Sequence, residues 1–165
     1  MGQLNLGNGA NFVGGTGGEL ADAPKGSMLQ YIEVAQSVIG PRFSTSSTSY
    51  TATNYLVNIT PKRDNSMIVI QGALSHSTQP DGSYAYIRCY QNGVSTDLYE
   101  AGAGLTSEWH HTSFKFVFFP NSTSQQQYKL YCRTGSSTKT AYFGWSGSAG
   151  STRNWNHMCA IEIAQ

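Results

Sequence analysis

Short runs of alternating apolar and polar residues recur along this chain, and clusters of Gly, Pro, Asn, Asp and Ser separate them. A period of two residues is that of a β-strand with one buried face. The pattern predicts no long helix. It predicts strands at 28–36, 55–60, 67–74, 84–91, 96–101, 113–119, 127–133, 139–145 and 156–164. So many short strands in one domain predict an all-β fold, an antiparallel two-sheet jelly-roll sandwich.

The last predicted strand, 156–164, ends one residue before the end of the printed sequence. His157, Cys159, Ile161 and Ile163 share one of its faces, at the spacing of a half-buried strand. Burying this segment requires a neighbouring strand on each side of it. We therefore expect it to lie inside its sheet.

The outer faces of several strands carry more aromatic residues than a solvated monomer needs. In 84–91, Ala85, Ile87 and Cys89 alternate on one face, opposite Tyr and Arg residues. Similar alternation places Phe114, Phe116 and Phe118 inward in 113–119, and Tyr128, Leu130 and Cys132 inward in 127–133. Tyr and Arg are typical of protein interfaces. We expect a homo-oligomer packed through one sheet, with the interface residues Tyr84, Tyr86, Arg88, Tyr90, Val117, Phe119 and Tyr131.

The first 26 residues hold eight glycines and few residues suited to a core, so they cannot fold alone. They form either a disordered leader or a flexible arm that orders on a partner. In the second interpretation Leu4, Leu6, Phe12 and Val13 are the apolar residues that anchor the arm to that partner. The compact domain then covers 27–165.

Loops and turns separate the strands. Asn92-Gly93 favours a tight hairpin because both residues tolerate positive φ. The Ser/Thr-rich segment 43–53 is expected to be a connector, and 101–104 and 144–150 are expected to be longer loops at the ends of the sandwich.

The composition argues against two classes of partner, nucleic acids and membranes. Only 12% of the residues are charged, against roughly 25% in ordinary domains, and the net charge is +1. No cluster of Lys and Arg indicates a nucleic-acid partner. No apolar run approaches the roughly 20 residues of a membrane span, and the Gly/Asn-rich start is not typical of a signal peptide. We expect neither nucleic-acid binding nor membrane insertion.

The sequence offers few candidates for catalytic or metal-binding residues. Cys89, Cys132 and Cys159 lie far apart in the sequence, which is not the spacing of zinc ligands, and we expect them to be reduced and packed. The adjacent His110 and His111 point to opposite faces of a strand, which argues against a shared metal. No Gly-x-Ser-x-Gly motif is present. We expect a protein without catalytic residues, metal or cofactor.

Aromatic residues in the loops raise the question of carbohydrate binding. Tyr142, Trp145 and Trp155 flank the segment 144–150, and Trp109 lies in another loop. Such rings either pack at the rim of the core or line a glycan site at one end of the oligomer. Both interpretations remain open.

Several segments follow the order of a known kind of domain. The strand MLQYIEVAQS leads through the Ser/Thr-rich connector to YLVNITPKRDNSMIVIQGALSHS, and YAYIRCYQNG, FKFVFFP, YKLYCR and a closing MCAIEIAQ follow. The ITPK corner and the terminal strand are the most characteristic pieces. In this order the chain resembles the trimeric jelly-roll virion surface proteins of tailed bacteriophages, which have the arrangement of tumour-necrosis-factor and C1q domains. The resemblance covers 27–165 and implies a threefold assembly with one sheet of each subunit facing the axis.

The resemblance implies a function as well as a fold. We expect a non-enzymatic virion structural protein, a homotrimeric capsid decoration or head-fibre protein made in the host cytoplasm and displayed on the particle. Its partners would be itself and the major capsid or tail proteins. One alternative is a receptor-binding tail-fibre tip or adaptor. Another is a lectin-like module that binds a host surface glycan.

Overall fold

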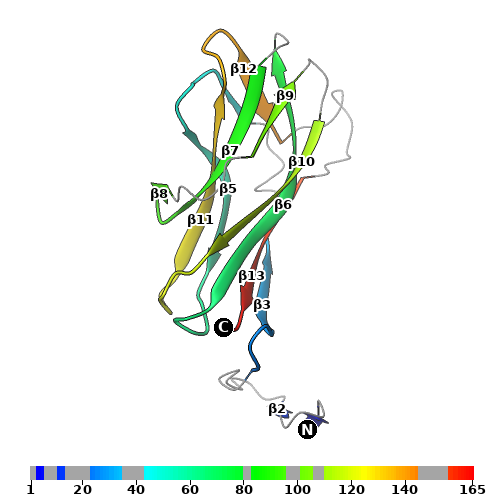
Figure 1. Cartoon of the computed structure of the whole chain (residues 1–165), viewed down its shortest axis with the longest axis vertical. Coiled ribbons are helices and arrows are strands. Elements are labelled where there is room, and N and C mark those ends of the chain that lie inside the picture. Colours follow the sequence, from blue (N-terminus) through cyan, green and yellow to red (C-terminus); the bar gives the residue numbers. More distant parts are fainter. Residues whose placement is uncertain are drawn as a thin grey trace.

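A computed structural model describes residues 3–5, 11–13, 23–34, 43–79, 83–95, 101–105, 110–144 and 156–165. All regular structure in these ranges is β-strand, and the strands of the main body form two sheets packed face to face (Figure 1). Within the described ranges, no helix has the length and hydrophobicity needed to cross a membrane.

The first sheet, sheet I, is built around the long strand β6. Over part of its length the strand order is β3-β13-β6-β10, and further along β6 the neighbours are β10 and β12, with β4 beyond β12. The strands of sheet I are β3 (Met28–Glu33), β4 (Phe43–Thr45), β6 (Met67–Gln79), β10 (His110–Phe118), β12 (Thr140–Phe143) and β13 (His157–Ile163).

The second sheet, sheet II, has the order β5-β11-β7, and β8 and β9 both pair with the free side of β7. The strands of sheet II are β5 (Thr51–Ile59), β7 (Ser83–Gln91), β8 (Val94–Ser95), β9 (Ala101–Leu105) and β11 (Gln126–Thr134). Asn92 and Gly93 join β7 to β8 with positive φ angles of 50° and 79°, as expected for a tight hairpin.

The strand order identifies the fold. Eight principal strands give the orders β3-β13-β6-β10 in sheet I and β5-β11-β7-β9 in sheet II, with every pairing antiparallel; the chain changes sheet after each of them except between β7 and β9. This is the order of a jelly roll, in which the chain winds twice around the same core. The predicted all-β, two-sheet jelly-roll sandwich is confirmed.

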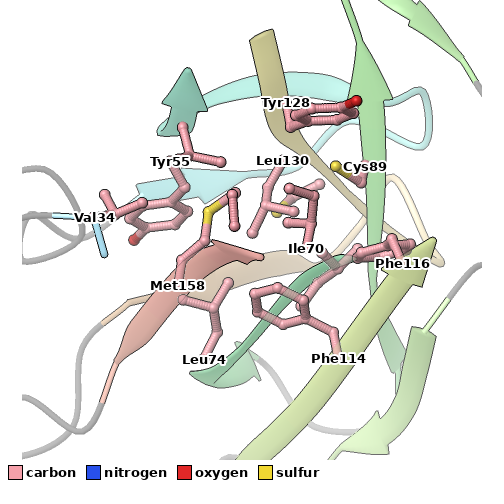
Figure 2. Close-up of a cluster of buried hydrophobic side chains, with 14 of the residues drawn as sticks. Val34, Tyr55, Ile70, Leu74, Cys89, Phe114, Phe116, Tyr128, Leu130 and Met158 are labelled. Carbon is pink, nitrogen blue, oxygen red and sulfur yellow. The ribbon is translucent and has the colours of Figure 1, made fainter. Parts of the chain in front are cut away.

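The core lies between the sheets, where side chains from both point toward one another (Figure 2). Tyr55 and Leu130 from sheet II meet Ile70, Phe116 and Met158 from sheet I. The predicted inward alternation is confirmed in three strands, whose core residues are Ala85, Ile87, Cys89, Phe114, Phe116, Phe118, Tyr128, Leu130 and Cys132. A local period of two was therefore sufficient to place these side chains.

The terminal strand has the expected position but the opposite orientation. β13 lies between β3 and β6, as predicted. Its core residues are Met158 and Ala160, however, so the face predicted from His157 onward points away from the core. The alternation was misleading because Ile161 and Ile163 lie beside Val69 and Met67 on the outer face of sheet I, whereas the inward set includes the buried Glu162.

Two predicted loops contain strands. The segment 43–53 includes β4 and the start of β5, and 101–104 belongs to β9. In both cases the strand forms because its backbone pairs with a distant strand, β12 for β4 and β7 for β9. Gly and Ala in 101–104 gave no side-chain pattern to detect. Segments 96–100 and 145–150 lie outside the described residues.

The N-terminal region contains a small hairpin of β1 (Gln3–Asn5) and β2 (Asn11–Val13), in which Leu4 lies opposite Phe12. Of the proposed anchors, only Leu6 lies outside the described residues. Where the domain begins, Gly26 N donates to the Ala164 carbonyl and Ala164 N donates to the Ser27 carbonyl. The chain therefore enters the domain beside the end of β13 (Figure 1).

Candidate interaction faces of the sandwich

The structure divides the predicted interface residues between two surfaces. Tyr84, Tyr86, Arg88, Tyr90 and Tyr131 extend from β7 and β11 on the outer face of sheet II. Val117, near the end of β10, and Phe119, the first residue after β10, lie on the outer face of sheet I. Because the core separates these faces, one sheet cannot pack all seven residues against a partner. The prediction of a single interface face was wrong in this respect.

The outer face of sheet I carries a continuous apolar row across four strands. Tyr31 pairs with Ile161, and Ile161 pairs in turn with Val69. Val69 lies opposite Val117 on β10. Val69 is only 3% exposed although it points away from the core, and Ile161 and Val117 flank it on the two neighbouring strands. The centre of this row is therefore already shielded from solvent within one chain.

A second apolar row runs beside the first. Ile163 lies opposite Met28 on one side and Met67 on the other. Phe119 follows Phe118, which pairs with Ile68, so it extends this row next to Met67. Met28, Tyr31 and Phe119 are 63%, 52% and 57% exposed. These two rows define the apolar face of sheet I. Contiguous exposed apolar surface is typical of interaction sites, which makes this face a candidate for one.

The apolar face gives way to polar residues further along the strands. Glu33, Cys159, Gln71 and Lys115 form the next row across β3, β13, β6 and β10. Gln71, Ser113, Lys115 and His157 line an open depression of about 580 Å³. The same sheet face is thus apolar at one end and polar at the other.

The outer face of sheet II is held together by its own aromatic contacts. The rings of Tyr90 and Tyr131 stack with centroids 3.8 Å apart. The guanidinium of Arg133 lies 3.9 Å from the centre of the Tyr86 ring, and that of Arg88 lies 4.6 Å from the centre of the Tyr50 ring. These contacts stabilise the Tyr and Arg side chains within one chain. Their presence on this surface therefore does not require a second subunit.

A buried carboxylate organises the end of sheet I. Glu162 is fully buried, and its Oε1 accepts hydrogen bonds from Lys62 N at 2.7 Å, Arg63 N at 3.2 Å and Ser66 Oγ at 2.5 Å. Its Oε2 accepts from Gln30 Nε2 at 2.6 Å. Glu162 thereby ties the ITPK corner to β13 and β3. Glu162 alternates in phase with Met158 and Ala160 along the strand, and this phase is the signal in the sequence that could have identified it as an inward residue.

The proposed glycan residues are not brought together by the described part of the chain. Tyr142 lies on β12, half-buried, opposite Ser77 of β6 and Ser44 of β4. Trp109, Trp145 and Trp155 lie outside the described residues. The glycan site therefore stays a prediction.

The cysteines and His110, candidate reactive residues in the described ranges, lie on strands. All three cysteines are free and buried, as predicted, and burial raises the pKa of the Cys89 and Cys132 thiols well above the ordinary range. His110 lies opposite His76 in the sheet. In the described ranges, no group of three or more His, Cys, Asp or Glu side chains is placed to hold a metal ion.

No protein-family model matches the chain, and no curated protein matches its sequence. Among solved structures it is similar to that of the infectious bursal disease virus Gx strain, with a TM-score of 0.44, 16% identity, and coverage of 81% of this chain and 32% of that one. The structure of T=1 particles derived from infectious bursal virus has a TM-score of 0.43 and 12% identity, with coverage of 99% of this chain and 40% of that one. A structure described as "CBM4 structure and function" has a TM-score of 0.32 and 14% identity, with coverage of 76% of this chain and 79% of that one. The chain spans about a third of the length of the first of these.

Proposed function

We propose that the protein is a non-enzymatic structural protein of a tailed-phage virion, and that it forms a homotrimer through the apolar face of sheet I. The observation that carries this proposal is the pair of apolar rows across β3, β13, β6 and β10. Met28, Tyr31 and Phe119 leave more than half of their side-chain surface exposed in one chain. Burial of these side chains against a second copy would lower the free energy by roughly 25 cal/mol per Å² of apolar area, before the cost of association is subtracted.

The threefold arrangement comes from the family resemblance, in which one sheet of each subunit faces the axis. Sheet I is the better candidate for that sheet because its outer face is apolar, whereas the side chains on the outer face of sheet II contact one another. Sheet II then faces outward from the trimer. This choice keeps Val117 and Phe119 as interface residues and assigns the five Tyr and Arg residues to the outer surface.

Attachment to the particle is assigned to the N-terminal arm. The chain enters the domain beside Ala164, at the end of sheet I that carries Met28 and Ile163. An arm that leaves from this end would bind the major capsid protein while the opposite end of the sandwich projects outward. This geometry suits a capsid decoration or head-fibre protein displayed on the virion surface.

Sedimentation equilibrium at micromolar concentration tests the assembly. We expect a trimer for the natural sequence and for Val94→Asp, and dissociation for Phe119→Asp. Val94 is the matched control because it is 66% exposed, against 57% for Phe119, but belongs to sheet II. A monomeric natural protein would overturn the trimer. Equal behaviour of the two variants would overturn the assignment of the face.

Arm attachment requires a separate test with virions that lack the protein. The full chain should bind such particles, while a chain that begins at residue 23 should remain trimeric without binding them. If the truncated trimer binds equally well, the arm is not the anchor.

A second candidate function is receptor binding at a tail-fibre tip, and Tyr84 favours it. This ring is 53% exposed and stacks beside Tyr86, with centroids 5.9 Å apart, on the sheet that faces outward. Isolated trimers that adsorb to host cells, and lose adsorption on Tyr84→Ala, would support this function over decoration. Binding to purified glycans without any association with virions would support the lectin-like alternative.

A further inference from the structure

Opposite charges lie at the two ends of one row on the outer face of sheet I. Glu33 on β3 pairs with Cys159, Cys159 pairs with Gln71, and Gln71 pairs with Lys115 on β10. Both charged residues are exposed. β3 and β10 are the first and last strands of this four-strand segment. The carboxylate and the ammonium therefore occupy opposite edges of the sheet at the same level along the strands.

These two groups are too far apart to pair within one chain. Neighbouring strands are about 4.8 Å apart, so three strand spacings separate the Glu33 and Lys115 backbones by about 14 Å. An ion pair requires a much closer approach of nitrogen and oxygen. Any direct partnership between them must therefore join two copies of the chain.

A closed ring brings these edges together. When sheet I of every subunit faces a common axis, with its strands roughly along that axis, the β3 edge of one copy meets the β10 edge of the next. Rotation about the axis preserves height, so residues of one row meet residues of the same row. Glu33 then faces Lys115 of the neighbouring copy, and Tyr31 approaches Val117 and Phe119.

We propose that Glu33 and Lys115 of adjacent copies form an ion pair that repeats at each subunit junction and sets the polarity of the assembly. The inference rests on the proposed self-association through sheet I. A junction of β3 with β3 that is centred on this row places Glu33 against Glu33, and the corresponding junction of β10 with β10 places Lys115 against Lys115. Like charges at a junction are unfavourable, so the pair selects the head-to-tail ring over these alternatives.

The division of roles follows from the row pattern. The apolar rows supply the surface that drives association, because their side chains lose contact with water when covered. The charged row determines which edges of neighbouring copies meet, since rim charges mainly affect specificity and the salt dependence of association. The two contributions lie side by side on one face and can be separated by mutation.

A charge-reversal cycle tests the pair. Sedimentation equilibrium would give the concentration of half-assembly for the natural protein, Glu33→Lys, Lys115→Glu and the double reversal, in 50 mM and 500 mM NaCl. We expect each single reversal to raise that concentration by about tenfold or more at low salt. The double reversal should return it to within about threefold of the natural value. Lys129→Glu, which reverses a charge on sheet II, should leave it unchanged.

Cross-linking of the natural sequence gives a second measurement that does not depend on variants. A carbodiimide joins a carboxylate directly to an amine only when the two are in contact. Peptide mass spectrometry of the cross-linked oligomer should identify a Glu33–Lys115 link between copies. Oligomers cross-linked only at other positions would overturn the ion pair.

The outcomes separate this inference from the proposed function. A natural trimer that is insensitive to both single reversals, or a double reversal that stays dissociated, overturns the pair and leaves the trimer standing. A monomeric natural protein overturns both. A natural dimer rescued by the double reversal supports the Glu33–Lys115 contact and overturns the threefold symmetry.

Discussion

The Glu162 carboxylate lies 2.7 Å from the backbone nitrogen of Lys62, so a fully buried strand residue caps the corner that leads into β6. Glu162→Gln keeps the shape but places an amide NH₂ beside either the Gln30 amide or the donors of the corner. We expect the free energy of unfolding to fall by about 2–4 kcal/mol, the range for losing charge-assisted hydrogen bonds to buried donors. Urea denaturation followed by tryptophan fluorescence measures it.

Glu33→Gln is the control for this substitution, because Glu33 is an exposed residue of the adjacent strand β3. Under conditions where both proteins are monomeric, it should change the free energy of unfolding by less than about 0.5 kcal/mol. Similar losses in the two variants would mean that the hydrogen bonds of Glu162 contribute little.

Gly72 is the glycine on which the packing of β6 depends. A Cβ at this position would lie 2.1 Å from the His157 carbonyl oxygen and 2.8 Å from Cζ of Phe114. The first contact is with backbone, so Gly72→Ala must displace β13 or β6. We expect a loss of about 3 kcal/mol in the free energy of unfolding, at the upper end for overpacking. Thermal and urea denaturation provide the measurement.

Gly135→Ala tests whether this loss is specific to position 72. A Cβ at Gly135 would lie 3.2 Å from Ser83 Oγ, a side-chain atom that can move. The expected loss is below about 1 kcal/mol. A stable Gly72→Ala protein would show that β13 tolerates a shift at His157.

Arg133 tests whether the outer face of sheet II stabilises the subunit or an interface. Its guanidinium lies 3.9 Å from the centre of the Tyr86 ring and 5.3 Å from that of Tyr50. Arg133→Ala should lower the free energy of unfolding by about 1 kcal/mol, as for a cation–π contact. The mass in solution should not change. Dissociation of the oligomer with unchanged subunit stability would instead place sheet II in the interface.

The buried thiols predict a loss of stability at alkaline pH. Burial raises the pKa of Cys89 and Cys132 in the folded protein above the value of about 8.5 expected when unfolded. The unfolded chain therefore loses these protons first, so the stability is fully present below about pH 8.5 and decreases as pH rises above it. Burial raises the pKa of Tyr55 and Tyr128 as well, which adds in the same direction above about pH 10.

Urea midpoints measured from pH 7 to pH 10.5 check this dependence. Each thiol contributes up to about 1.4 kcal/mol per pH unit once its unfolded form is ionised. A thiol reagent added to the folded protein at pH 8 should react with the cysteines only after unfolding, because all three are buried. A midpoint that does not change across this range would contradict the expected effect of burial.

Local patterns predicted the core well where a strand has one buried and one solvated face. Ile87 and Phe116 lie in the core as their alternation indicated. The same reasoning did not identify the core face of β13, because both of its faces carry apolar residues and the inward set includes Glu162. The strand β9 was not predicted because its Gly and Ala residues show no alternation of apolar and polar side chains. It forms through backbone pairing with β7.

The sequence by itself determined the all-β class, the positions of most strands and the inward residues of β7, β10 and β11, because these follow from a period of two within each segment. Only the tertiary structure decided which outer residues share a surface. Tyr31, Val69, Val117 and Ile161 come from four separated segments and form one row only through strand register. Likewise, only folding placed the Arg133 guanidinium over the Tyr86 ring. Register depends on the pairing of distant strands, and no local pattern in a single segment contains that information.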